Sequence, residues 1–287
     1  LFLVEELQSG AWRHELGLRH EWQDVQVKRS AADSRHRGTS IAFGSTWQFA
    51  EGYALFGNLS RSQRLPTAEE LYARGPHAAT RTVELGNARL DEETGYNLEL
   101  GLRKTAGRLT YSLSLFRNQV DDFIHAADAG YDPGGDYRVV EYRQDDAVLR
   151  GFEASAALAL SDRLELGLFA DSVRGRLRDG GNLERIPADR YGLRLNHQIT
   201  SALDGELEAY RVERQDRLAE HETGTDGYTM LNAGLSFRGF SEAGVDYLIY
   251  ARAGNLLNDK ARQHSSFIKD DVLLPGRNLT LGVRFSL

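Results

Sequence analysis

The chain has 287 residues, with no cysteine, 5 prolines and a single methionine. Without thiols it can hold neither a disulfide framework nor a thiolate metal site. It also lacks any run of about 18 apolar residues, which excludes helical membrane spans. The net charge of -7 argues against a nucleic-acid-binding protein, because such proteins carry a basic patch. With 12 Tyr, 12 Phe and 3 Trp, the chain has too many aromatic residues to be disordered.

Strict alternation of apolar and polar residues is the dominant pattern. In residues 96–102 (YNLELGL) the even positions are apolar and the odd ones polar or glycine, and residues 109–115 and 279–287 repeat this pattern. A period of two residues is typical of strands with one apolar face. No long stretch shows the helical spacing of apolar residues. The sequence therefore predicts an all-β chain.

About thirteen strands are expected from this alternation and from the turn residues between its segments. They cover residues 1–8, 11–25, 38–50, 53–63, 93–103, 107–125, 137–159, 163–176, 187–199, 204–215, 227–238, 245–256 and 275–287.

The connections between these strands alternate in length. Short turns, such as those at Ser9-Gly10 and Glu51-Gly52, alternate with long connections, such as 64–92 and 257–274. An antiparallel up-and-down transmembrane β-barrel has short turns at one rim and long loops at the other. A water-soluble sandwich of alternating strands is the alternative, but nothing in its topology requires this alternation.

The polar face of the expected strands also fits a barrel. It mixes charged residues such as Glu99, Arg103 and Glu153 with many Gly, Ser and Asn, as a polar lumen would. Aromatic residues near strand ends would form an interfacial belt. These are Trp12, Trp22, Trp47, Tyr53, Tyr72, Tyr191, Tyr228 and Tyr247.

The expected strand count is odd, whereas bacterial single-chain barrels have an even number. If the C-terminus lies at the short-turn rim, the first strand starts on the long-loop side, where a barrel chain does not begin. The sequence also opens on Leu1 and shows no signal peptide. We therefore expect residues 1–287 to be the C-terminal part of a longer barrel.

Three segments, taken in this order, resemble motifs of the TonB-dependent outer-membrane receptors. They are residues 58–72 (NLSRSQRLPTAEELY), 84–93 (ELGNARLDEE) and 253–258 (AGNLLN). The resemblance covers residues 40–287. It implies a 22-stranded barrel with an N-terminal plug domain, located in the outer membrane of a Gram-negative bacterium. It also implies a monomer in outer-membrane lipid that the TonB inner-membrane complex energises through the absent N-terminal part.

Two further segments are similar to the zinc-uptake (ZnuD-type) receptors of that family. They are residues 73–77 (ARGPH) and 264–270 (HSSFIKD), the latter followed by LPGR at 274–277. The resemblance implies active uptake of a scarce ligand, with zinc as the transported ligand and no intrinsic cofactor. It implies a transporter and not an enzyme.

A zinc site in this chain requires about four nitrogen or oxygen ligands, because no thiolate exists. His77 follows Gly75-Pro76, a rigid turn that can direct an imidazole into the vestibule. The resemblance implies a ligand in this region. Glu70 is a nearby carboxylate, and His264 lies in the last long connection. The alternative for each is an ordinary solvated loop residue. The remaining ligands are expected in the absent plug.

Three other functions are compatible with parts of the pattern. The first is a receptor of the same family for haem, a siderophore or a cobalamin. The second is a passive porin, which requires an open lumen and no energy input. The third is a barrel-shaped hydrolase, which requires a nucleophile and histidine pair. His20 and His197 lie on strands in phase with the apolar face, which argues against this third function.

Overall fold

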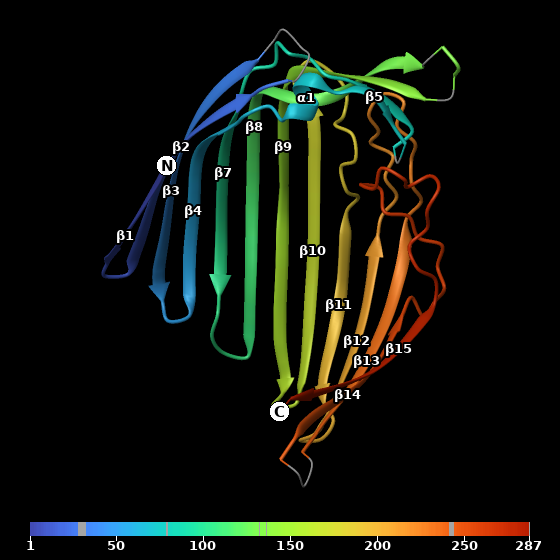
Figure 1. Cartoon of the computed structure of the whole chain (residues 1–287). Helices are drawn as coiled ribbons and strands as arrows, with labels where there is room; N and C mark the ends of the chain where they lie inside the picture. The colour runs from blue at the N-terminus through green and yellow to red at the C-terminus, as the bar shows by residue number, and fades with distance from the viewer. Residues whose placement is uncertain (28–32, 79, 132, 136, 241–243, 287) are drawn as a thin grey trace.

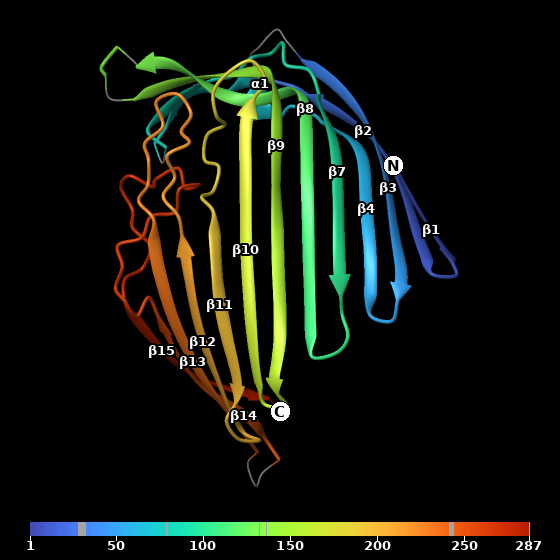
Figure 2. The ribbon, with the colours of Figure 1, turned by 180° about the vertical axis from the view of Figure 1, so that it is seen from behind.

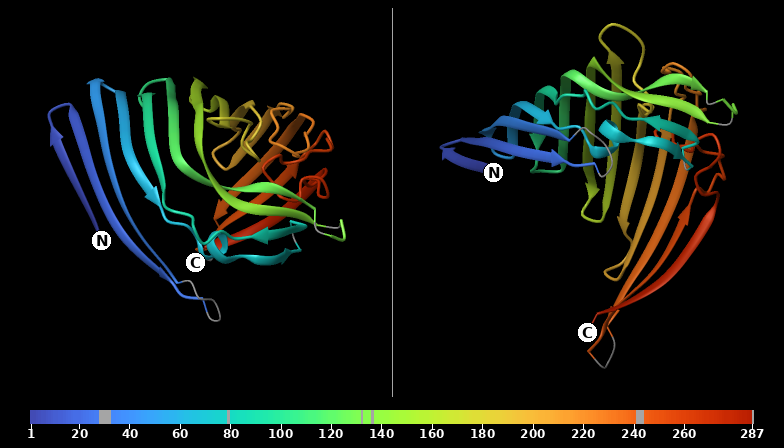
Figure 3. Two further views of the ribbon diagram at one scale, coloured as in Figure 1. Left: turned by 90° about the horizontal axis from the view of Figure 1, so that it is seen from above. Right: turned by 45° about the horizontal axis from the view of Figure 1, so that its top comes forward.

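A single antiparallel sheet forms almost the whole molecule (Figure 1). The structure is a computed structural model that describes residues 1–286 except 28–32, 79, 132, 136 and 241–243. The sheet is curved and open, since β1 and β15 at its ends do not pair with each other (Figure 3). No helix among the described residues is long and apolar enough to span a membrane.

Thirteen strands follow one another along the sheet in chain order, interrupted only by a short helix and a hairpin. They are β1 (Phe2–Ser9), β2 (Trp12–Val25), β3 (Ser34–Ala50), β4 (Tyr53–Arg64), β7 (Glu93–Lys104), β8 (Leu109–Tyr131), β9 (Arg138–Ser161), β10 (Leu164–Leu177), β11 (Arg190–Gln198), β12 (Leu203–Val212), β13 (Tyr228–Phe240), β14 (Asp246–Gly254) and β15 (Asn278–Ser286). The predicted all-β, up-and-down arrangement of about thirteen strands is confirmed.

The predicted alternation of connections is also confirmed. The short turns that the structure describes, from β1–β2 to β11–β12, lie at one end of the sheet together with the end of β15, and the long connection 257–277 lies toward the other end (Figures 1 and 2). β1 accordingly runs from the long-loop end toward the turn at Gly10, which has a positive φ of 57° that suits glycine.

The two faces of the sheet differ as the alternation predicts. One face presents exposed apolar residues such as Leu59, Leu98 and Leu115. The other face carries hydrogen-bonded polar groups: Asn58 Nδ2 donates to Glu99 Oε2 at 3.0 Å, and Ser114 Oγ donates to Glu99 Oε1 at 2.5 Å. An exposed apolar face of this extent is typical of a surface that contacts lipid.

Aromatic rings cover glycines on neighbouring strands. Phe56 on β4 pairs with Gly101 on β7, and Phe116 on β8 pairs with Gly151 on β9. A Cβ at position 101 would lie 2.0 Å from Phe56 Cζ, so only glycine fits beneath this ring. Such pairs fill the gap that a strand glycine leaves.

The long-loop end contains structure that the sequence did not predict. The segment expected to be the plain connection 64–92 forms a helix and a hairpin: α1 (Ala68–Tyr72), β5 (Arg74–His77) and β6 (Thr82–Leu85). β6 pairs in parallel with β9, with Thr82 opposite Arg138. β8 extends further at this end than predicted, to Tyr131 instead of residue 125, while β9 begins close to the predicted residue 137; the two strands have 23 and 24 residues. A strand needs only about 9–11 residues to cross a bilayer, so both project beyond it.

Buried apolar residues gather at this same end. Leu71 of α1 packs with Leu90 and Ile124, and Tyr228 packs with Met230 and Ala261 of the last long connection. The described strands form one sheet, and these two small cores fix the long connections above it.

The predicted aromatic belt is confirmed in part. Trp12 and Trp47 stack at the short-turn end with ring centroids 5.3 Å apart, and both are exposed on the apolar face. Tyr228 was assigned to the belt wrongly, because it is buried beneath the last connection. Tyr72 also packs against a loop core and not on the apolar face.

Candidate metal-binding site

Glu70, a predicted zinc ligand, lies in the first turn of α1. Its Oε2 accepts hydrogen bonds from Thr67 N at 2.8 Å and Arg64 Nη1 at 2.9 Å, and its N–H is capped by Thr67 Oγ1 at 3.2 Å. This reciprocal pair is a capping box. Arg64 also binds both carboxylate oxygens of the buried Glu93, at 2.6 and 2.7 Å. Both side-chain bonds reach Oε2, so a metal bound through that oxygen would have to displace them.

His77, the second predicted ligand, lies at the end of β5 with its side chain 57% exposed. Its Nδ1 is 3.0 Å from Glu84 Oε1 and 3.0 Å from Thr80 Oγ1. Glu84 also accepts a hydrogen bond from Tyr142 Oη at 3.3 Å. Burial, together with the charge of Glu84, raises the pKa of Tyr142 to about 12. These contacts hold the imidazole through one nitrogen only.

His264, the third predicted ligand, is buried in the last long connection. Its Nε2 lies 3.0 Å from Glu222 Oε1, and its Nδ1 lies 3.0 Å from Thr225 Oγ1. Lys269 Nζ lies in the same cluster, 3.3 Å from Glu222 Oε1 and 2.6 Å from the carbonyl oxygen of Thr223. The ammonium group therefore takes the position beside Glu222 and His264 that a metal cation would need.

The electrostatics of this cluster agree with its geometry. Burial and the charge of Lys269 lower the pKa of His264, and Glu222 offsets this only in part. Burial would raise the pKa of Glu222, but hydrogen bonds from the backbone of Ala219 and Arg185 and the charge of Lys269 outweigh it and lower that pKa. At neutral pH Glu222 is therefore a carboxylate and His264 a neutral imidazole.

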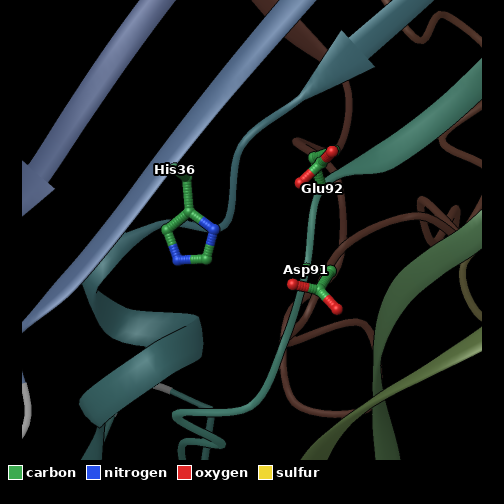
Figure 4. Close-up of side chains that lie close together, drawn as sticks. All are labelled: His36, Asp91 and Glu92. Atoms are coloured by element: carbon green, nitrogen blue, oxygen red, sulfur yellow. The ribbon is translucent and has the colours of Figure 1, made fainter.

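The three predicted ligands thus lie in three separate clusters. Among the described residues, only His36, Asp91 and Glu92 bring three potential ligand atoms together, all within 4.8 Å of one another. Figure 4 shows the imidazole of His36 turned toward the two carboxylates. His36 belongs to β3, and the two acidic residues immediately precede β7 at the long-loop end.

Sequence reasoning missed this group. His36 and the Asp91-Glu92 pair are far apart in the chain, and no short motif with metal-ligand spacing links them. Two adjacent carboxylates at the start of a strand were the only local signal.

The polar face below the loops lines an open hollow between β9 and β15. Its lining includes Glu165, Arg194, Glu208, Asn232 and Arg252. A meander with an apolar outer face, a polar inner face and packed loops at one end defines the wall of an outer-membrane barrel. This architecture can admit and hold a polar ligand, because both the hollow and the loops above it are lined by charged side chains.

The chain belongs to the family described as TonB dependent receptor-like, beta-barrel, whose model matches residues 1–256. Barrels of this family lie in the outer membrane of Gram-negative bacteria, and the chain is an outer-membrane protein. The family consists of receptors and transporters and not of enzymes.

Solved structures share the fold. The copper transporter OprC superposes with a TM-score of 0.82 at 17% identity, over 96% of this chain and 45% of that one. An FrpB iron transporter from Neisseria meningitidis gives 0.72 at 15%, over 98% and 44%. The siderophore receptor PirA from Acinetobacter baumannii gives 0.66 at 17%, over 98% and 44%. The chain thus spans less than half the length of these proteins.

Proposed function

We propose that this chain is part of a receptor for TonB-dependent uptake of a metal ion or metal chelate, with zinc as the transported ligand. The observation that carries the uptake function is the match of residues 1–256 to the receptor barrel family. Since the chain spans 45% of the copper transporter, we further propose that residues 1–287 are the C-terminal part of the barrel. The plug and the segment that contacts TonB then belong to the remainder of the receptor.

The side chains at the long-loop end support a metal ligand. Imidazole and carboxylate groups suit zinc, and the absence of cysteine leaves nitrogen and oxygen as the ligand atoms. The same groups also accept copper and iron, and proteins that transport those metals share the fold. The choice of zinc over copper and iron is therefore tested separately from the uptake function.

His77 is the predicted ligand whose environment suits this role best. Glu84 contacts Nδ1, and the side chain is 57% exposed, so Nε2 is the nitrogen left to bind a metal. A carboxylate that binds one imidazole nitrogen orients the other toward a metal. Glu70 and His264 would each have to give up existing contacts to act as ligands.

Uptake of ⁶⁵Zn by zinc-starved cells tests the proposal. Cells that lack the receptor gene should lose the energy-dependent part of zinc uptake, and cells that lack TonB should lose the same part. Copper uptake and growth on ferric siderophores should be unchanged. If the deletion leaves zinc uptake intact but reduces copper or iron uptake, that metal and not zinc is the transported ligand. Uptake that needs no TonB would instead indicate a passive pore.

A further inference from the structure

At the long-loop end, His36, Asp91 and Glu92 bring one imidazole and two carboxylates together in one place. Their ligand atoms lie within 4.8 Å of one another. Ligand atoms around a tetrahedral zinc ion lie about 3.4 Å apart when each is about 2.1 Å from the metal. To bind one zinc ion, the ligand atoms would therefore have to move closer by rotation of the side chains, which come from two backbone segments that face each other (Figure 4).

The backbone that carries these side chains is fixed without a metal. Gln144 Nε2 donates to Asp91 O at 3.0 Å, and Asp91 N donates to Gln144 Oε1 at 3.0 Å. The next residue but one, Glu93, is held by both guanidinium bonds from Arg64. His36 is opposite Gln23 in the ladder between β2 and β3. The three positions are therefore preorganised, and a ligand would not have to order them.

The side chains themselves are available. The Nε2 of His36 is buried and has no hydrogen-bond partner among the described residues. Figure 4 shows this nitrogen on the side of the ring away from the carboxylates and Nδ1 on the side that faces them, so a metal beside the carboxylates would be bound through Nδ1. Glu92 accepts one long bond, 3.4 Å from Gln63 Nε2. In Glu70, by contrast, Oε2 already accepts bonds from Thr67 N and Arg64. The Nε2 of His264 is also buried without a hydrogen-bond partner, but it lies 3.0 Å from Glu222 Oε1, which Lys269 already pairs with.

Negative charge accumulates around the group. Burial, and then the charges of Asp146, Asp121, Asp91 and Glu92, raise the pKa of Asp122. Arg178 pairs with Asp121 at 3.0 Å and with Asp146 at 2.5 Å. Within the described part of the chain, no cation pairs with Asp91 or Glu92 at salt-bridge distance. A divalent cation beside them would supply the missing positive charge.

We propose that His36, Asp91 and Glu92 form a metal site at the long-loop rim that takes a divalent transition-metal ion of the zinc class. One imidazole and two carboxylates favour such an ion over Mg²⁺ or Ca²⁺, which prefer sets of oxygen ligands. Three protein ligands leave a fourth position for water, as in zinc sites that exchange their fourth ligand. The inference rests on the proposed function in one respect: the rim site would be a point of first capture on the uptake route.

Zinc titration of the whole receptor, purified in detergent, tests the site. We compare the wild type with His36→Ala and Glu92→Gln, and we use His125→Ala as the control, because His125 lies at the same rim and pairs with Asp145 at 2.8 Å. The loss of an outer-shell partner costs about 10–100-fold in metal affinity. Loss of a ligand should cost at least as much, so both site variants should lose one bound zinc ion while the control retains it. Co²⁺ in place of zinc should give a visible absorption band that His36→Ala removes.

Unchanged zinc stoichiometry and affinity in both site variants would overturn the proposal. Glu92→Gln preserves the shape of the side chain and its bond to Gln63, so a fold defect in His36→Ala would not prevent this test. The result is independent of transport. Zinc binding through His36 in a receptor whose deletion leaves zinc uptake intact would refute the proposed transport ligand and confirm the site. Zinc uptake that needs the receptor, with binding that does not need His36, would refute only the site.

Discussion

The ammonium group of Lys269 lies 3.3 Å from the carboxylate of Glu222, and the two side chains are only 7% and 5% exposed. They join the last two long connections, since Glu222 precedes β13 and Lys269 precedes β15. Thr223 strengthens the junction: its hydroxyl donates to Asp270 at 2.8 Å, and its carbonyl oxygen accepts from Lys269. An ion pair this buried is a fixed part of the loop structure and not a surface contact.

The first prediction concerns Lys269→Met. Removal of the ammonium leaves buried Glu222 with His264 and two backbone N–H groups but no cationic partner, and the loss of one partner of a buried ion pair typically costs about 3–5 kcal/mol. The loss should be local, because the pair joins loops and not barrel strands. Hydrogen exchange in residues 216–226 and 257–274 should accelerate, while exchange in β9 and β10 stays unchanged. The double variant Glu222→Leu/Lys269→Met, which removes both charges, should recover most of the protection. Equal exchange in Lys269→Met and the wild type would refute this role.

The second prediction is a pH dependence of the same loops. The pKa of His264 is lowered from its ordinary value of 6.5, and that of Glu222 is lowered from 4.5. The unfolded loop therefore binds protons at a higher pH than the folded loop does. It follows that the loop is stabilised above pH 6.5 and loses stability as the pH falls below 6.5, first through His264 and then, below 4.5, through Glu222.

Hydrogen exchange in residues 257–274 at pH 7.5, 6.0 and 5.0, corrected for the intrinsic rate, measures this effect. His264→Gln should abolish the change between pH 7.5 and 5.0, because it removes the imidazole whose lowered pKa causes it. A loop whose protection does not change over the interval in the wild type would contradict the prediction.

The sequence predicted the strands well because one face of a barrel wall contacts lipid and the other faces a polar lumen. Alternation such as Leu98-Glu99-Leu100 is then imposed on every membrane-crossing strand, and a local pattern reveals it. The long connections carry no such constraint. The parallel pairing of β6 with β9 and the packing of Leu71 on Ile124 depend on contacts between distant segments. The one local signal for the unpredicted helix α1 is the Thr67-x-x-Glu70 spacing, which is typical of a capping box.

The candidate ligands show the same limit. A carboxylate or imidazole in a loop has the same local sequence whether its lone pairs are engaged or available. Glu70 and His264 carry the right chemical groups, but their neighbours Arg64 and Lys269 engage those groups. His36 becomes a candidate only when β3 and the start of β7 face each other.

The third prediction separates the two roles of Glu70. Thr67→Ala removes the hydroxyl that caps α1 and should destabilise the helix by about 1 kcal/mol. Glu70→Gln retains an acceptor for Thr67 N but loses the charge beside Arg64. We expect Glu70→Gln to leave zinc affinity unchanged. Hydrogen exchange in Ala68–Tyr72 measures the stability of the capped helix in each variant. A tenfold loss of zinc affinity in Glu70→Gln, with the helix still protected, would instead make Glu70 a ligand.

The fourth prediction concerns the close approach of Phe56 to Gly101. A Cβ added at Gly101 would lie 2.0 Å from Phe56 Cζ, so Gly101→Ala must displace the ring and should cost about 1–3 kcal/mol. Gly17→Ala is the matched control, because it lies on the same polar face and its Cβ would meet only Ala42 Cβ, at 3.9 Å. Thermal unfolding of the purified receptor should show a lower midpoint for Gly101→Ala and no loss for Gly17→Ala. Phe56→Leu/Gly101→Ala should regain part of the loss, because a smaller side chain makes room for the methyl group. Equal midpoints for the two single variants would show that the ring moves freely and that the glycine is not required.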